Sequence, residues 1–152
     1  MIKFGTSGWR GIIGEDFTFD NVRIASQGIA NYLKKNKQPG SGVIVAYDTR
    51  FLSEKFASEA AKILAFNGIK AFLCTRDVPT PCVAFETIRR KAMGAINFTA
   101  SHNPPEYNGL KFSTSNGAPA LPEVTRQIEH EIHLVQQKNE RLDVYERTEL
   151  IE

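Results

Sequence analysis

The chain has 152 residues, and its 19 Lys and Arg against 17 Asp and Glu give a formal net charge of +2. Hydrophobic residues make up 41% of the sequence and charged residues 24%, values typical of a globular protein. This composition excludes a disordered chain, a collagen-like rod and, with only two cysteines, a disulfide-dense scaffold. No apolar stretch approaches the about 18 residues of a membrane span, and the first residues do not resemble a signal peptide. We therefore expect a cytoplasmic protein that contacts no membrane.

Charge is distributed unevenly along the chain. Residues 1–122 carry 15 basic and 9 acidic side chains, whereas residues 123–152 carry 4 basic and 8 acidic ones. The basic residues are scattered rather than gathered in one stripe, so we expect no nucleic-acid partner. A mildly basic body is compatible with a small anionic ligand.

The first third of the chain predicts a loop, a helix and a buried strand. The Gly-rich start leads into a short strand near residues 9–13. Thr18 is a candidate N-cap for a helix over residues 19–36, in which apolar residues recur at helical spacing. The continuous apolar run at residues 43–47 is typical of a buried strand.

The middle of the chain predicts a second helix, a strand and a third helix. Ser53 is expected to cap the second helix, which ends at the Asn67-Gly68 pair, a combination typical of a helix C-cap. Residues 69–75 predict a strand. The Thr80-Pro81 pair predicts the start of the third helix, because proline is favoured in the first helical turn.

The last third completes an alternating pattern of strands and helices. Residues 92–98 predict a strand, residues 99–109 a long polar loop, and residues 110–113 a returning strand. A last helix is expected from residue 121 to about residue 139. This alternation predicts the α/β class, as a three-layer α/β/α domain with a mainly parallel or mixed central sheet.

We expect two parts in the domain organisation. Residues 1–139 form an N-terminal α/β domain that carries a candidate active-site serine. Residues 140–152 are charged and only weakly periodic, and they form a tail or the start of a linker to a further domain.

The first segment with chemical character spans residues 5–11, GTSGWRG. Glycines let successive backbone N–H groups turn toward one point and form an anion-binding nest. An arginine there adds a bidentate donor suited to phosphate, although a flexible arm with a surface arginine is the simpler interpretation of this segment taken alone. The candidate phosphate-binding residues are Gly5, Thr6, Ser7, Gly8 and Arg10.

The second segment spans residues 99–112, TASHNPPEYNGLKF, and follows the end of a predicted strand. Open α/β sheets place ligands at this end of their strands. Ser101 is a candidate nucleophile, and the two prolines after Asn103 stiffen the chain beyond it. The Asn108-Gly109 pair predicts a turn that brings Lys111 back toward Ser101.

Together these segments resemble the α-D-phosphohexomutase family, which includes phosphoglucomutase and phosphomannomutase. Residues 99–104, TASHNP, look like the active-site serine motif of the family, and residues 108–111, NGLK, look like its following Asn-Gly-x-Lys. Residues 5–11 look like its N-terminal loop. The three segments occur in the right order, and the resemblance covers residues 1 to about 140.

The resemblance implies a role for each matching residue. Ser101 matches the serine that carries a phosphoryl group and exchanges it with a hexose phosphate through a bisphosphate intermediate. Arg10, His102 and Lys111 match the cationic group around that phosphate, and Lys111 is similar to the proposed general acid/base. Asn103 lies within the same motif and is a candidate for binding the phosphate. The implied activity is that of an isomerase that moves phosphate between the 1- and 6-positions of glucose or mannose phosphate.

The resemblance also implies groups that this sequence does not supply. The family binds Mg²⁺ through the phosphoserine, here Ser101, and a DGDGDR-type loop, but this chain contains no D-x-D-x-D. The expected cofactors are Mg²⁺ in the full-length enzyme and a hexose 1,6-bisphosphate as activator. The expected partners are a hexose phosphate substrate and the remaining domains, and the isolated domain is expected to be inactive.

Two other interpretations stay open. The chain is alternatively a stand-alone module that binds a phosphate or sugar phosphate without turnover. A serine hydrolase built on Ser101 and His102 is less favoured, because adjacent side chains on an extended segment point apart.

Overall fold

The computed structural model describes residues 2–5, 8–138, 142 and 148–152. Their helices and strands alternate as the sequence predicts. In chain order they are β1 (Trp9–Ile12), α1 (Phe19–Lys35), β2 (Val43–Tyr47), α2 (Ser53–Phe66), β3 (Ala71–Leu73), α3 (Thr80–Arg89), β4 (Gly94–Phe98), β5 (Tyr107–Thr114), α4 (Pro122–Lys138) and the short 3-10 helix η1 (Thr148–Leu150). Within these described residues, no helix has the length and apolar character to cross a membrane.

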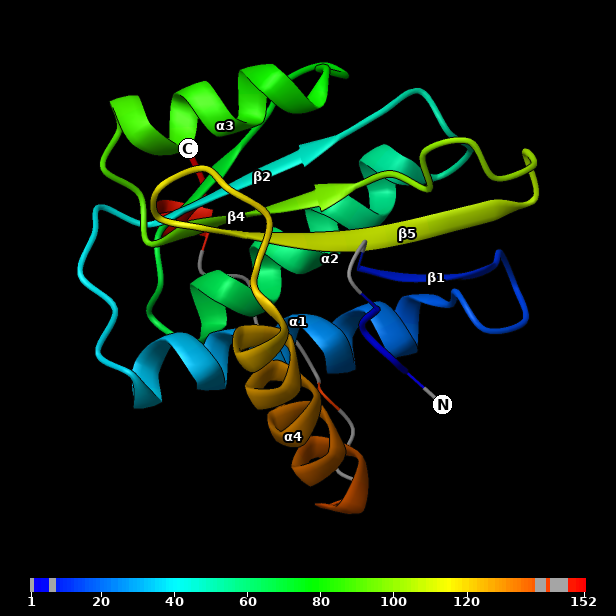
Figure 1. The fold of residues 1–152 in the computed structure, drawn as a ribbon, viewed down its shortest axis with the longest axis horizontal. Coiled ribbons are helices and arrows are strands. Elements are labelled where there is room, and N and C mark those ends of the chain that lie inside the picture. The colour runs from blue at the N-terminus through cyan, green and yellow to red at the C-terminus, as the bar shows by residue number, and fades with distance from the viewer. Residues whose placement is uncertain (1, 6–7, 139–141, 143–147) are drawn as a thin grey trace.

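The elements form three layers around one mixed sheet (Figure 1). The strand order is β1-β5-β4-β2-β3, with β2 parallel to β3 and β4, and β5 antiparallel to β4 and β1. Helices α1 and α2 lie together on one face of the sheet, and α4 packs on α1. Helix α3 covers the other face over β2 and β4. The predicted α/β/α architecture with a mixed sheet is therefore confirmed.

Alternation of side chains along the strands separates the core from the open face of the sheet. Trp9 and Leu110 are buried on the side of α1 and α2, so their neighbours Arg10 and Lys111 lie on the opposite face. In the core, the ring of Phe17 stacks on Trp9 with centroids 4.4 Å apart. This packing holds β1 in place and thereby fixes the position of Arg10.

Local signals predicted several helix ends correctly. Thr18 caps α1, because its Oγ1 accepts a hydrogen bond from the N–H of Asn21 at 3.2 Å. Gly68 follows α2 with a φ of +75°, the left-handed conformation expected after a helix. Helix α3 begins at Thr80 with a proline in its first turn, as predicted.

Two predictions about polar residues are wrong. Ser53 does not cap α2, since the N-cap is Leu52 and the Ser53 hydroxyl lies 3.2 Å from Asp48 Oδ1 instead. Asn108-Gly109 is not a turn but part of β5, which begins at Tyr107 and pairs with β1. In both places long-range pairing replaces the local structure that these residues favour.

The last residues pack against the free edge of the sheet. Ile151 forms a parallel bridge to Ala71, and the Leu73 N–H donates to the carbonyl of Glu152 at 2.8 Å. The Glu152 carboxylate also pairs with Lys70 and, at 3.9 Å, with Arg90. Residues 151 and 152 thus cover the edge of β3, while the division of the chain after residue 139 stays a prediction.

Candidate active site

The candidate site lies where β2 and β4 end at the same edge of the sheet. Tyr47 and Phe98 are register partners at the ends of these parallel strands, and the N–H of Asp48 donates to the Phe98 carbonyl at 3.0 Å. The chain after β4 forms the serine loop, residues 99–106, and the chain after β2 carries Arg50. Two segments far apart in the sequence therefore meet at the edge where α/β sheets bind ligands.

Ser101 occupies a left-handed conformation at the exposed tip of the serine loop. Its φ is +56°, which is uncommon for a residue with a side chain. Its N–H donates to Thr99 Oγ1 at 3.1 Å, and the Asn103 N–H donates to the Ala100 carbonyl at 3.1 Å. These two bonds fold the loop into a tight turn that presents the serine hydroxyl to solvent.

The Ser101 and His102 side chains approach each other. Ser101 Oγ lies 3.4 Å from His102 Nδ1. The expectation that these neighbours would point apart is wrong, because Ser101 is left-handed rather than extended. Among the described residues, no carboxylate contacts His102 to orient it as the third member of a hydrolase triad would.

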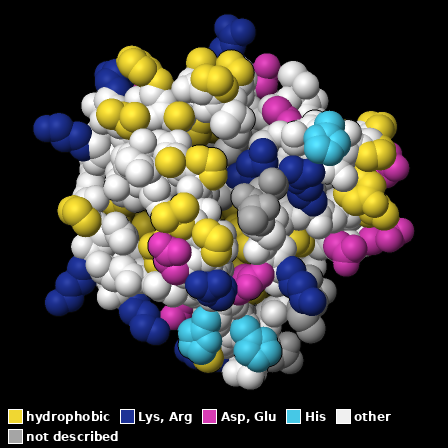
Figure 2. Space-filling model, viewed as in Figure 1, with side chains coloured by type: hydrophobic (Ala, Val, Ile, Leu, Met, Phe, Trp, Pro, Cys, Tyr) yellow, Lys and Arg dark blue, Asp and Glu magenta, His cyan; other side chains and the backbone are white. Residues whose placement is uncertain are grey.

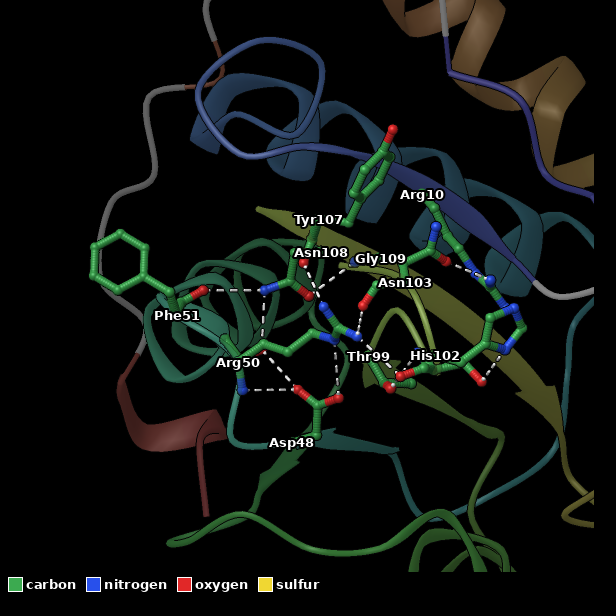
Figure 3. A network of polar contacts seen from close by, with 12 residues as sticks. Arg10, Asp48, Arg50, Phe51, Thr99, His102, Asn103, Tyr107, Asn108 and Gly109 are labelled. Carbon is green, nitrogen blue, oxygen red and sulfur yellow. Dashed lines mark hydrogen bonds and ion pairs between the residues drawn. The ribbon is translucent and has the colours of Figure 1, made fainter. Parts of the chain in front are cut away.

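Arg50 holds the serine loop by its backbone carbonyls (Figure 3). Its side chain is only 13% exposed. Its Nη2 donates to Ser101 at 2.9 Å and Asn103 at 2.7 Å, and its Nη1 donates to Pro104 at 2.8 Å and Tyr107 at 3.0 Å. One guanidinium thus binds three carbonyls of a loop that has no strand or helix to order it, together with the Tyr107 carbonyl at the start of β5.

Two further polar residues support this arrangement. Asp48 accepts the backbone N–H of Arg50 at 3.1 Å, and its carboxylate lies 3.7 Å from Arg50 Nε. Asn108 is fully buried, donates to Ser53 Oγ at 2.9 Å and accepts the N–H of Gly109 at 2.8 Å. Arg50, Asp48 and Asn108 were not among the predicted site residues. Asp48 and Arg50 could have been selected from the sequence, because the pattern Asp-x-Arg directly follows the apolar strand at residues 43–47.

Arg10 approaches the serine loop from β1. Its Nη1 donates to Asn103 Oδ1 at 2.6 Å, while its buried Nε has no hydrogen-bond partner among the described residues. Figure 3 shows Arg10 and His102 on the side of the loop opposite Arg50. The structure therefore brings together the predicted residues Arg10, His102 and Asn103 around Ser101.

Lys111 is the second cation on the open face of β1 and β5. Burial lowers the pKa of its amine, the positive charge of Arg10 lowers it further, and the Asp48 carboxylate partly opposes both. Figure 2 shows basic side chains both near the middle of this face of the molecule and along its edges. A lysine with a lowered pKa beside an arginine suits both binding of an anion and proton transfer.

Gly5 and Gly8 do not present their N–H groups as the predicted anion-binding nest requires. The N–H groups of Gly5 and Gly8 each donate to the other residue's carbonyl at 3.1 Å, so neither is free for a ligand. Thr6 and Ser7 lie outside the described residues. Gly8 still has a steric role, because a Cβ there would collide with the Leu110 carbonyl and lie 2.9 Å from Lys111 Cγ.

The described residues do not by themselves fit a Mg²⁺ site. They contain no cluster of three or more His, Cys, Asp or Glu side chains that could hold a metal ion. Mg²⁺ takes oxygen ligands, typically carboxylates together with phosphate. Beyond an oxygen on a phosphorylated Ser101, the ligands would have to come from elsewhere.

Comparison with known proteins identifies the family. Residues 1–139 match the family model described as phosphoglucomutase/phosphomannomutase, alpha/beta/alpha domain I. The chain belongs to this family. The resemblance of residues 5–11 and 99–112 to the phosphohexomutases is thereby confirmed. The chain corresponds to domain I of the family.

Similar proteins carry several mutase names. A phosphoglucomutase of Staphylococcus saprophyticus is 37% identical over 142 residues, which cover 90% of this chain and 25% of that protein. A phosphoglucosamine mutase of Rippkaea orientalis is 38% identical over 129 residues, covering 83% of this chain and 26% of that protein. A crystal structure from Thermus thermophilus, of a candidate phosphomannomutase, superposes with a TM-score of 0.82 at 39% identity, covering 86% of this chain and 30% of that one. The chain thus spans about a quarter of the length of these curated relatives.

Proposed function

We propose that this chain is the phosphoserine-bearing domain of a hexose-phosphate mutase, which moves a phosphoryl group between the 1- and 6-positions of glucose or mannose phosphate. The observation that carries the proposal is the exposed, left-handed Ser101 in a loop that Arg10 contacts through Asn103, with Lys111 near enough to Arg10 for the arginine charge to lower the lysine pKa. A phosphate on Ser101 would carry about −1.5 to −2 charges at neutral pH. The two cations would offset that charge where it accumulates during transfer.

The transfer step assigns a role to each residue around Ser101. A sugar hydroxyl oxygen attacks the phosphorus, the new P–O bond forms, and the bond from phosphorus to Ser101 Oγ breaks. The neutral amine of Lys111 accepts the hydroxyl proton, for which its lowered pKa prepares it. The departing Ser101 Oγ takes up a proton, and His102 Nδ1 lies 3.4 Å away to supply it. The bisphosphate then returns its other phosphoryl group to Ser101 by the same steps in reverse.

Substrate choice and the remaining ligands belong to the rest of the proposed enzyme. Relatives of similar identity are named for glucose and for glucosamine phosphates, so the family alone does not select a sugar. Mg²⁺, when bound, would supply additional positive charge at the phosphoryl oxygens. We expect that neither the sugar nor the metal is held by this chain alone.

Peptide mapping after incubation of the whole natural protein with a hexose 1,6-bisphosphate tests the assignment. Phosphate is expected on Ser101 and is expected to be absent in Ser101→Ala. Phosphate on Ser7 or Thr99 instead would contradict the proposal. The 152-residue chain alone is expected to fold without turnover, and isomerisation of glucose 1-phosphate by this chain would show that other domains are not required.

A further inference from the structure

The contacts of Arg50 fix the direction of one particular peptide group. Its Nη2 binds the Ser101 carbonyl at 2.9 Å, so that carbonyl points toward the guanidinium. The Ser101–His102 peptide is trans, and in a trans peptide the C=O and N–H point in opposite directions. The backbone N–H of His102 therefore points away from Arg50.

The backbone N–H of His102 faces the side of the serine loop on which Arg10 lies. Figure 3 shows Arg10 and His102 across the loop from Arg50. The N–H of His102 has no hydrogen-bond partner in the part of the chain that the structure describes, whereas its neighbours Ser101 and Asn103 both donate within the loop. An unpaired backbone donor next to a nucleophilic serine is the arrangement that stabilises negative oxygen in transfer reactions.

We propose that Arg50 is a positioning residue, which orients the Ser101–His102 peptide so that the His102 backbone N–H donates to an oxygen of the phosphoryl group on Ser101. This inference rests on the proposed function. The side chain of Arg50 makes no contact with the phosphate, and it acts by holding the carbonyls of Ser101 and Asn103. Lysine cannot replace it, because a single ammonium does not span four carbonyls with a planar fork.

Selective labelling isolates the signal of this N–H group. Ser101–His102 is the only Ser-His pair in the sequence, so carbonyl-¹³C serine combined with ¹⁵N histidine marks this amide within the chain. We expect its amide proton to move downfield when Ser101 is phosphorylated in the whole natural protein. In Arg50→Lys that displacement is expected to shrink, which a merely structural role for Arg50 would not produce.

Transfer kinetics provide the second measurement. We expect Arg50→Lys to slow phosphoryl transfer from Ser101 by roughly tenfold or more, the effect of losing one charge-assisted hydrogen bond. The matched control is Arg23→Lys, because among the described residues the Arg23 side chain pairs only with Asp20 and Glu59, on α1 and α2. Equal transfer rates and equal amide displacement in the two variants would overturn the proposal. A wild-type protein that takes no phosphate on Ser101 would instead overturn the proposed function.

Replacing the Ser101–His102 amide by an ester tests the role of this N–H directly, even if Arg50→Lys does not fold. Incorporation of the α-hydroxy analogue of histidine removes this one N–H and leaves Arg50 and the imidazole in place. We expect the same slowing of transfer, by roughly tenfold or more. Transfer at the wild-type rate in the ester would show that the phosphoryl group does not use this amide.

Discussion

Arg10 and Arg50 bind the same loop from opposite sides, and the difference between them separates function from stability. Arg50 is 13% exposed and donates to four backbone carbonyls, with Asp48 beside its Nε. Arg10 donates to the Asn103 side chain, and its buried Nε has no partner among the described residues. A buried donor without a partner costs about 1–3 kcal/mol, so Arg10 is not placed for stability. The contrast teaches that Arg50 orders the loop from one side, while Arg10 and Lys111 on the other side stay available for a ligand.

The largest expected effect is the loss of kcat on substitution of Lys111. Lys111→Arg keeps the positive charge but cannot lose a proton near neutral pH. If Lys111 is the general base, kcat in the whole natural protein falls by roughly 10²–10⁴-fold while KM changes little. Steady-state kinetics across pH measure this split. A near-parental kcat would make Lys111 an electrostatic contact only.

Paired lysine substitutions test the contrast between the two arginines directly. Arg50→Lys replaces several charge-assisted hydrogen bonds by one and is expected to lower the free energy of unfolding by about 2–3 kcal/mol. Arg10→Lys is expected to change stability little and to raise KM, because it loses the bidentate fork for phosphate. Urea denaturation and steady-state kinetics on both variants separate the two effects. An equal loss of stability in both variants would show that Arg10 and Arg50 do not divide into a ligand-binding and a loop-stabilising residue.

Two glycines in the left-handed conformation, Gly8 and Gly14, separate the cost of backbone strain from the cost of a steric clash near Lys111. Gly8 has a φ of +87°, and a Cβ there would meet Leu110 and Lys111, whereas Gly14 has a φ of +88° with nothing within 4 Å. Gly14→Ala is expected to cost about 1 kcal/mol for the backbone conformation alone. Gly8→Ala adds the steric conflict and is expected to cost about 1–3 kcal/mol in total. Denaturation curves of the two variants give the difference, and similar losses would show that Gly8 does not control the approach of β1 to Lys111.

The smallest expected effect is a pH-dependent gain in stability. The pKa of Lys111 is lowered in the folded state, so the folded protein binds this proton less tightly than the unfolded chain does, and the lysine charge disfavours folding at pH values below its ordinary pKa. Lys111→Met should therefore be slightly more stable than the wild type at neutral pH. The advantage should vanish as pH rises through the folded pKa and past the ordinary value of 10.5. Urea denaturation at neutral and alkaline pH tests the sign, with Lys111→Gln as a polar control.

The sequence by itself determined most of the elements and the family. Thr18, the Asn67-Gly68 pair and Thr80-Pro81 mark helix ends because capping depends on residues within one turn. The apolar run at residues 43–47 indicates a buried strand for the same local reason. The motifs around Ser101 indicate the family because their residue types and order are specific, and residues 1–139 match its domain I.

Only the tertiary structure decided how the site is held. Asn108 predicts a turn by local preference, yet it is buried in β5 because pairing with β1 and bonds to Ser53 satisfy its amide. Ser53 likewise leaves the cap position to bond with Asp48. Arg50 lies about fifty residues before the loop it binds, and nothing in its neighbours predicts four carbonyl acceptors from another segment. Such contacts depend on the register of strands distant in sequence, which local residue preferences do not encode.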